Sequence, residues 1–161
     1  MKIAIYAGTF DPITNGHIDI LTKASKAFDK IILAVAEHTG KSTLFSWEER
    51  CDLCERSIVH NKNIEVMKFS GLVVDFARKV NATIMIRGLR AVSDFEYELS
   101  LALMNKNLCE DLETVFFVPD NKYLYLSSTM IREVIALGGD ASEFISECVE
   151  KALKEKMKKQ K

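Results

Sequence analysis

Short apolar runs alternate with segments of helical periodicity along almost the whole of this 161-residue chain. The run Lys30–Ala36 is nearly continuous in apolar residues, which is typical of a strand buried on both faces of a sheet. Other apolar runs recur between the helix-like segments. They predict five strands, at Lys2–Ala7, Lys30–Ala36, Asn63–Phe69, Ala82–Ile86 and Glu113–Val118.

Helical signals fill the intervals between the strands and continue after the last of them. Ser46-Trp-Glu-Glu49, for example, is a capping box, whose hydroxyl and carboxylate are spaced to satisfy the first free amides of a helix. Helices are expected at Gly16–Phe28, from Ser46 to about Val59, from a cap at Ser70 through Lys79, from about Val92 to Leu108, and from Ser127 or Ser128 to Gly138-Gly139, with one or two more at the C-terminus. Repeated strand–helix units predict an α/β fold: a Rossmann-like, doubly wound and mainly parallel sheet of about five strands, with helices on both faces.

The composition is that of an ordinary globular protein, with 48% apolar residues, 28% charged residues and a net charge of −1. Nucleic-acid and membrane surfaces usually carry a clear excess of basic residues, so neither partner is expected. The N-terminal apolar run is too short for a signal peptide, and no apolar window is long enough to span a bilayer. We therefore expect a cytoplasmic protein.

The four cysteines, Cys51, Cys54, Cys109 and Cys148, lack the spacing of a secreted disulfide framework. Cys51 and Cys54 form a C-x-x-C pair, but this pair lies inside a helical pattern. No second pair and no pair of histidines follows at the spacing of a zinc site. We expect these cysteines to pack against the core, and no metal site is predicted in the protein itself.

The first strand leads into a turn whose residues suit phosphate. The segment Gly8-Thr-Phe-Asp-Pro connects the strand to a helix that begins near His17. Such turns in α/β proteins present backbone N–H groups, and the dipole of the following helix favours an anion. Because the turn also carries the hydroxyl of Thr9 and the imidazole of His17, it indicates phosphate chemistry rather than phosphate binding alone.

Three other strand ends carry cationic or hydroxyl side chains: Lys41 after the second strand, Arg87 and Arg90 after the fourth, and Ser127, Ser128 and Thr129 after the fifth. Each has an ordinary alternative role. A histidine or hydroxyl at a helix start is often only a cap, and a lysine in a glycine loop is often only solvated. The arginines have Asp94, Glu96 and Glu98 as alternative partners. Because the carboxyl ends of parallel strands share one edge of the sheet, the joint position predicts a polyphosphate site.

Two common phosphate-binding motifs are absent. Gly40-Lys41-Ser42 lacks the first glycine of a P-loop, since Val35 stands in its place, and no G-x-G-x-x-G follows the first strand. No serine or cysteine has a convincing set of histidine and acid partners, so a hydrolase triad is also disfavoured.

The segment Gly8-Thr-Phe-Asp-Pro-Ile-Thr-Asn-Gly-His17 resembles the T/H-x-G-H motif of the nucleotidyltransferase superfamily. Two further segments are Ile86-Arg-Gly-Leu-Arg-Ala-Val-Ser-Asp-Phe-Glu-Tyr-Glu98 and Leu126-Ser-Ser-Thr-Met-Ile-Arg132. Together they resemble the bacterial phosphopantetheine adenylyltransferase family, over about residues 2–155. The resemblance implies a single nucleotidyltransferase domain over residues 1–161.

Members of that family transfer the adenylyl group of ATP to 4′-phosphopantetheine with Mg²⁺, which yields dephospho-coenzyme A and pyrophosphate in the penultimate step of coenzyme A biosynthesis. The resemblance implies that His17 and Lys41 are catalytic, with His17 stabilising the transition state of a direct in-line displacement. It implies that Lys41, Thr9, Val73 and Arg87 contact phosphopantetheine. The implied ATP site consists of Thr9, Phe10, His17, Gly88, Leu89, Arg90, Glu98, Tyr123, Leu124, Tyr125, Leu126, Ser127, Ser128 and Thr129. The family also implies a homohexamer that can bind coenzyme A as a feedback ligand.

The chain departs from the family pattern at two positions. Ala7 stands where proline is often found, and Ser42 stands where a second basic residue often follows the lysine. Two alternatives stay open: an enzyme that modifies another phosphate acceptor, such as nicotinamide mononucleotide or glycerol phosphate, and a non-catalytic sensor of adenine nucleotides. The Arg-Gly-Leu-Arg segment argues against the first, and retention of both His17 and Lys41 argues against the second.

Overall fold

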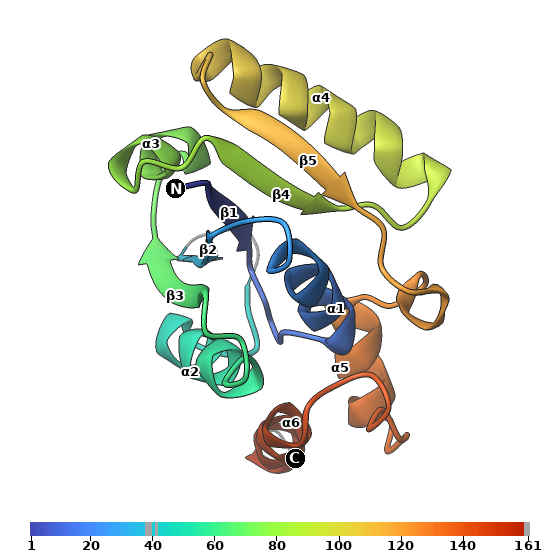
Figure 1. Cartoon of the computed structure of the whole chain (residues 1–161). Helices are drawn as coiled ribbons and strands as arrows, with labels where there is room; N and C mark the ends of the chain where they lie inside the picture. Colours follow the sequence, from blue (N-terminus) through green and yellow to red (C-terminus); the bar gives the residue numbers. More distant parts are fainter. Residues whose placement is uncertain (38–39, 41, 160–161) are drawn as a thin grey trace.

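The computed structural model of the chain describes residues 1–37, 40 and 42–159. Lys41, one of the expected site residues, lies outside the described residues, so its predicted position is not tested. Five strands form one sheet: β1 (Ile3–Gly8), β2 (Lys30–Ala36), β3 (Ile64–Phe69), β4 (Ile84–Gly88) and β5 (Glu113–Phe117). Their order is β3-β2-β1-β4-β5, and every neighbouring pair is parallel (Figure 1). The expected five-stranded parallel sheet is confirmed.

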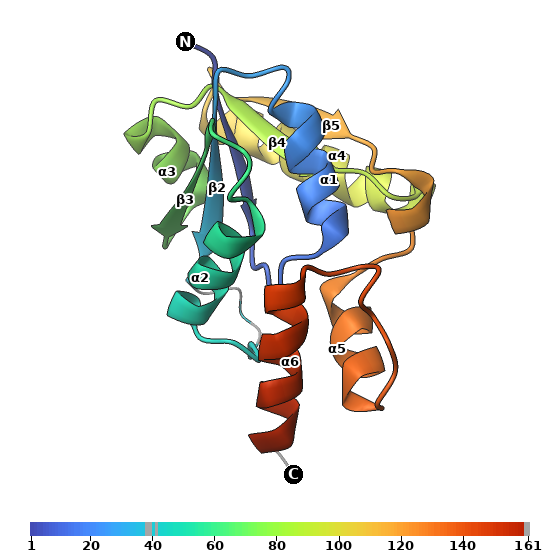
Figure 2. The same cartoon turned by 60° about the horizontal axis from the view of Figure 1, so that its bottom comes forward.

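The sheet is covered on both faces, as predicted for a doubly wound fold. The helices in the described residues are α1 (Asn15–Ala24), α2 (Trp47–Ser57), α3 (Val73–Lys79), α4 (Val92–Leu108), α5 (Ser128–Ala136) and α6 (Glu147–Lys159), with a 3₁₀ turn at Asn121–Tyr123. Helices α3 and α4 lie on one side of the sheet, and α1 and α2 lie on the other (Figure 1). Helices α5 and α6 extend beyond the arrowheads of the strands (Figure 2).

Alternation along β1 divides the apolar core into two clusters. Ala4 and Tyr6 pack in a cluster that includes residues of α1, α2, α5 and α6. Ile5 and Ala7 belong to a second cluster, with residues of α3. Successive side chains of a strand point to opposite faces, so a buried central strand supplies both clusters at once.

Local signals set several boundaries as predicted, but not all. The capping box is present: the Ser46 hydroxyl accepts from the amide of Glu49 at 3.2 Å, and the Glu49 carboxylate accepts from the amide of Ser46 at 2.8 Å. The predicted cap at Ser70 is wrong. Helix α3 begins at Val73 without a side-chain cap, since Gly71 has a φ of +80° and interrupts the helical path.

The fourth strand is longer than predicted, which changes the setting of an expected site residue. Residues Arg87 and Gly88 belong to β4, because they pair with Phe116 and Phe117 of β5. Arg87 therefore projects from the end of a strand instead of from a loop. The first helix is shorter than predicted and ends at Ala24.

The C-x-x-C pair has the packing role that the sequence favoured. Cys51 and Cys54 are buried on α2 within the first apolar cluster, and all four cysteines are unpaired. No group of three or more potential metal ligands occurs among the described residues. Within that same part of the chain, no helix is both long and apolar enough to cross a membrane.

Candidate active site

Two pockets meet where the strand order reverses, between β1 and β4. The chain leaves β1 toward one face of the sheet and leaves β4 toward the other. Ligands of open α/β sheets bind at such a position. Each pocket has a volume of about 240 Å³. Both are lined by the residues at the two strand ends and by one acid of α4, namely Ala7, Gly8, Thr9, Arg87 and Glu98.

The first of these, which we call the polar pocket, lies on the side of α1 and α5. Its remaining lining residues are Tyr6, Phe10, Thr14, His17, Ile20, Gly88, Arg90, Pro119, Leu126, Ser127 and Ser128. The N-termini of two helices thus reach this pocket, since His17 is in the first turn of α1 and Ser127 caps α5. Helix N-termini and guanidinium groups both favour bound anions, so the pocket suits a polyphosphate.

His17 is held by the capping box that begins α1. The Thr14 amide donates to Nδ1 of His17 at 3.0 Å, and the Thr14 hydroxyl accepts from the His17 amide at 3.5 Å. A backbone N–H can only donate, so Nδ1 must be the unprotonated nitrogen of a neutral ring. The proton is then on Nε2. Phe10 packs edge-to-face against the ring, with 5.1 Å between centroids, and fixes its plane.

The environment of His17 also keeps it neutral. Burial, and then the positive charges of Arg90 and Arg87, lower the pKa of His17 to about 4. At neutral pH, the site therefore presents an uncharged N–H donor. A protonated ring would lose the acceptor at Nδ1 and break the capping box.

This pKa predicts how stability depends on pH. The unfolded chain binds a proton on His17 below about pH 6.5, whereas the folded chain binds it only near pH 4. The contribution of neutral His17 to the unfolding free energy is fully present above pH 6.5. It is lost as the pH falls toward 4, by about 3 kcal/mol in total. We expect His17→Gln, which can still accept from the Thr14 amide, to flatten this part of the curve. Urea unfolding of the wild type and of His17→Gln between pH 4 and pH 7 measures the unfolding free energy of each. Parallel plots of that free energy against pH would contradict the role assigned to His17.

Arg87 forms a two-pronged ion pair with Glu98 at the junction of the pockets. Its Nε and one terminal nitrogen each donate to a carboxylate oxygen of Glu98 at 2.7 Å, and the other terminal nitrogen donates to the carbonyl of Ala7 at 3.2 Å. Glu98 is buried, and its hydrogen bond raises the pKa of Arg87. Of the five N–H groups of a guanidinium, about two remain for a substrate phosphate. The sequence left a pairing role and a substrate role open for Arg87, and the pairing is present.

Arg90 connects the start of α4 to the segment before α5. Its Nε donates to Asp94 at 3.3 Å, which was also one of the alternatives open from the sequence, and a terminal nitrogen donates to the carbonyl of Leu126 at 2.9 Å. The hydroxyl of Ser127 accepts from the amide of Met130 at 3.1 Å and caps α5. The guanidinium is thereby directed along the wall of the polar pocket.

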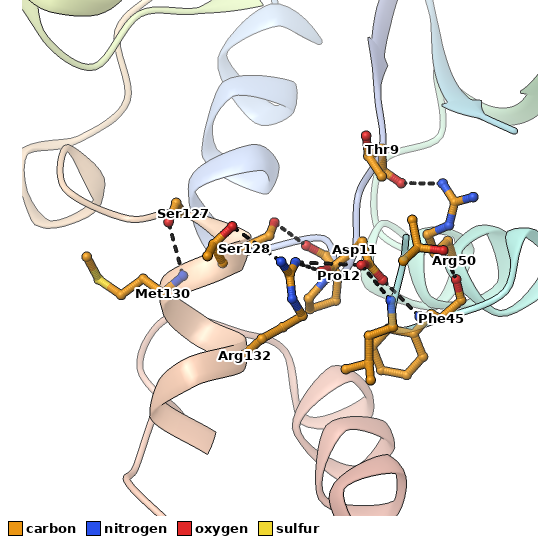
Figure 3. Close-up of polar contacts among 12 residues, drawn as sticks. Thr9, Asp11, Pro12, Phe45, Arg50, Ser127, Ser128, Met130 and Arg132 are labelled. Atoms are coloured by element: carbon orange, nitrogen blue, oxygen red, sulfur yellow. Dashed lines mark hydrogen bonds and ion pairs between the residues drawn. The ribbon is translucent and has the colours of Figure 1, made fainter. Parts of the chain in front are cut away.

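A network centred on Asp11 joins the turn after β1 to two distant segments, the one before α2 and helix α5 (Figure 3). The buried Asp11 carboxylate accepts from the amides of Leu44 and Phe45, both at 2.9 Å. Arg132 of α5 donates to the carbonyl of Asp11 at 2.5 Å, and Ser128 donates to the carbonyl of Pro12 at 2.8 Å. A further pocket of about 240 Å³ continues from His17 along this network and is lined by Thr9, Phe10, Asp11, His17, Ser42, Thr43, Ser128, Thr129 and Arg132.

The second pocket at the junction, the apolar pocket, lies on the side of α3 and α4. In addition to the five shared residues, it is lined by Ala36, Phe69, Val73, Met85, Leu101, Ala102, Asn105 and Thr114. Most of these side chains are apolar, with an amide and a hydroxyl among them. Such a pocket suits an extended, uncharged arm whose charged end lies at Thr9 and Arg87.

Most of the predicted site residues come together here. The polar pocket contains Thr9, Phe10, His17, Arg87, Gly88, Arg90, Glu98, Leu126, Ser127 and Ser128, the apolar pocket contains Val73, and the pocket beyond His17 contains Thr129. Four residues of the implied ATP site line none of these pockets: Leu89, Tyr123, Leu124 and Tyr125. Tyr125 instead packs edge-to-face on Phe144, with 5.9 Å between ring centroids.

Sequence reasoning assigned no role to Asp11, Arg50 or Arg132. Asp11 belongs to the turn that holds Thr9 and binds the amide of Phe45, while Arg50 and Arg132 donate to carbonyls of that turn. A signal was available for Arg132, because it follows Ser128 by four residues and so shares a helix face with it. The contacts of Asp11 and Arg50 join segments far apart in the sequence and leave no local pattern.

Comparisons with known proteins agree with this geometry. A cytidylyltransferase-like family model matches residues 5–134. A phosphopantetheine adenylyltransferase of Alkaliphilus metalliredigens is 51% identical over 97% of this chain and 99% of its own length, and one of Lawsonia intracellularis is 51% identical over 97% and 91%. A crystal structure assigned as a nicotinate-nucleotide adenylyltransferase of Vibrio parahaemolyticus shares the fold, with a TM-score of 0.74 and 21% identity over 95% of this chain and 99% of that one.

The fold and the family model define the class: the chain is a nucleotidyltransferase of the cytidylyltransferase-like type. Identity of 51% over nearly the full length then narrows the assignment. Within that class, the chain belongs to the phosphopantetheine adenylyltransferase family.

Proposed function

We propose that this enzyme transfers the adenylyl group of ATP to 4′-phosphopantetheine, which yields dephospho-coenzyme A and pyrophosphate. The observation that carries the proposal is the meeting of a polar and an apolar pocket at Thr9 and Arg87. ATP occupies the polar pocket, and the pantetheine arm occupies the apolar pocket beside Val73. The acceptor phosphate then lies at the junction, next to the α-phosphate of ATP.

The chemistry is a direct in-line displacement at the α-phosphate. The nucleophile is a phosphate oxygen that is already anionic near neutral pH, so no general base is required. The enzyme has to align two anions and stabilise the negative charge that develops on the α-phosphate and on the leaving pyrophosphate. The Nε2–H of His17 donates a hydrogen bond to the oxygens on which this charge develops. The imidazole ring is neutral at pH 7 because its pKa is lowered.

The other residues have complementary roles in the proposal. Lys41 and Arg87 bind the acceptor phosphate, and Lys41 reaches the transferring phosphate as well. Arg90, Ser127, Ser128 and Thr129 bind the ATP phosphates. Phe10, Gly88, Glu98 and Leu126, which line the polar pocket, complete the ATP site. Leu89, Tyr123, Leu124 and Tyr125 belong to the proposal through the family resemblance and lie outside that pocket.

Mg²⁺ enters as part of the ATP complex. The walls of the polar pocket carry donors such as His17 and Arg90 instead of a cluster of carboxylates, so they fit a metal that is held by phosphate oxygens. When bound, the ion neutralises part of the charge on the phosphates.

The test is pyrophosphate release from ATP and Mg²⁺, with and without 4′-phosphopantetheine, with the second product identified by mass. Release that depends on this acceptor and gives dephospho-coenzyme A is expected. Release with nicotinamide mononucleotide or glycerol phosphate instead would keep the class and overturn the acceptor. ATP binding without release, for any acceptor, would favour the nucleotide sensor.

Self-association as a homohexamer is part of the proposal, and α4 supports it. The inner face of this helix lines the pockets through Glu98, Leu101, Ala102 and Asn105. Its outer faces nevertheless carry exposed large apolar side chains: Phe95, Tyr97, Leu99, Leu103, Met104 and Leu108. This many exposed large apolar side chains on one helix is typical of a protein–protein interface.

A charged substitution on α4 tests the assembly. We expect Leu103→Glu, at a side chain that is 57% exposed, to shift the protein from hexamers to smaller species without unfolding it. Leu137→Glu is the matched control, because Leu137 is 89% exposed outside α4. Sedimentation equilibrium measures the mass of each species. A wild-type monomer, or equal behaviour of the two variants, would contradict the role of α4.

Two further parts of the proposal follow from family membership. Coenzyme A, which contains the product within its structure, is proposed as a feedback ligand of the same pockets. The cytoplasm is the proposed location, and four unpaired cysteines are compatible with a reducing compartment.

A further inference from the structure

Arg50 of α2 is a charged side chain buried without a charged partner. Only 1% of the residue is exposed to solvent. The ion pairs of α2 in the described residues involve Glu48, Glu49 and the Asp52–Arg56 pair, and none involves Arg50. An arginine in this state costs stability unless its N–H groups are well satisfied, so its retention calls for a specific role.

Its partners are backbone carbonyls at the active edge of the sheet. One terminal nitrogen donates to the carbonyls of Thr9 and Ala36, both at 2.7 Å, and the other donates to the carbonyl of Glu37 at 3.3 Å. Figure 3 shows the guanidinium directed at Thr9. Thr9 follows β1 and Ala36 ends β2, so a single planar group fixes the carboxyl ends of two neighbouring strands relative to each other.

These two strand ends serve the acceptor side of the site. Thr9 and Ala36 both line the apolar pocket. The polar pocket shares only Thr9 with the contacts of Arg50, and its other walls come from α1, β4, α4 and α5. A shift of the Arg50 contacts would therefore change the acceptor pocket more than the nucleotide pocket.

We propose that Arg50 is a positioning residue for the acceptor substrate: it acts through the carbonyls of Thr9 and Ala36 and sets the place of the acceptor phosphate against ATP. The proposal rests on the function proposed above, since it assigns the apolar pocket to the acceptor. The fork of N–H groups matters as well as the charge. Lysine keeps the charge but cannot reproduce the planar set of donors.

The experiment compares steady-state kinetics of wild type, Arg50→Lys and Arg50→Met with both substrates varied. We expect the KM for 4′-phosphopantetheine to rise about tenfold in Arg50→Met and less in Arg50→Lys, while the KM for ATP stays within about twofold. Arg56→Met is the matched control, because Arg56 lies on the same helix with an exposed side chain, and it should change neither KM. If Arg50→Met does not fold, Arg50→Lys carries the comparison.

A purely structural role would lower the melting temperature and leave both KM values unchanged, which would overturn the proposal. An equal rise in both KM values would also overturn it. The wild-type assay separates failure of the positioning role of Arg50 from failure of the proposed function. If the wild-type enzyme prefers a different acceptor, the same comparison is made with that acceptor. A selective rise in its KM would then support the positioning role.

Discussion

Replacement of His17 by alanine is expected to lower kcat by about 10² to 10³-fold, while the affinity for ATP changes little. The reason is that, in the proposed mechanism, the bond from Nε2–H to the α-phosphate strengthens as charge develops in the transition state, and removal of one such donor costs about this much. In the proposed complex, ATP keeps its other contacts in the ground state, with Arg90 and the N-terminus of α5, which line the same pocket.

His17→Gln is the informative companion to the alanine variant. Glutamine at this position can still accept from the Thr14 amide in the capping box, so helix α1 keeps its first turn. A low kcat in both variants with normal ATP binding would assign the loss to the imidazole N–H. Steady-state kinetics and equilibrium titration with ATP measure the two quantities. Loss of ATP binding with normal turnover at saturation would contradict the catalytic role of His17.

Substitution of Arg87 by methionine should reduce stability and activity together. The variant leaves the buried Glu98 carboxylate without its partner, which costs about 3–5 kcal/mol of unfolding free energy. It also removes a proposed ligand of the acceptor phosphate. Urea unfolding and steady-state kinetics measure the two effects separately.

The double variant Arg87→Met/Glu98→Gln distinguishes the ion pair from the contact with substrate. Removing the unpaired charge should restore most of the unfolding free energy that the single variant loses, because a neutral glutamine costs less to bury than an unpaired carboxylate. Turnover with phosphopantetheine should remain low and fall below that of the single variant Glu98→Gln, which measures the part of the loss that Glu98 causes as a residue of the proposed ATP site. If the double variant instead recovered both stability and turnover, Arg87 would act only as the partner of Glu98, and its assignment as a substrate ligand would be wrong.

The shared location of the site residues could be predicted from the sequence where they stand at strand ends and helix starts. Thr9 and His17 follow β1, and Ser127 and Ser128 begin α5, so their shared edge follows from the order of elements in a parallel sheet. For Arg87, the sequence offered two roles. The ion pair with Glu98 depends on the packing of α4 against β4, which no local pattern describes.

The sequence by itself determined the alternation of strands and helices, the parallel sheet and the capping box at Ser46. These features depend on periodicity and on hydrogen bonds between residues that are close in the chain. Only the tertiary structure decided that β4 extends through Arg87 and Gly88, because the pairing with β5 sets that boundary. It alone also placed Arg132 on Asp11, 121 positions away, and Arg50 on Thr9, 41 positions away. Such contacts form when separate elements pack at one edge of the sheet, so their partners are set by topology rather than by spacing.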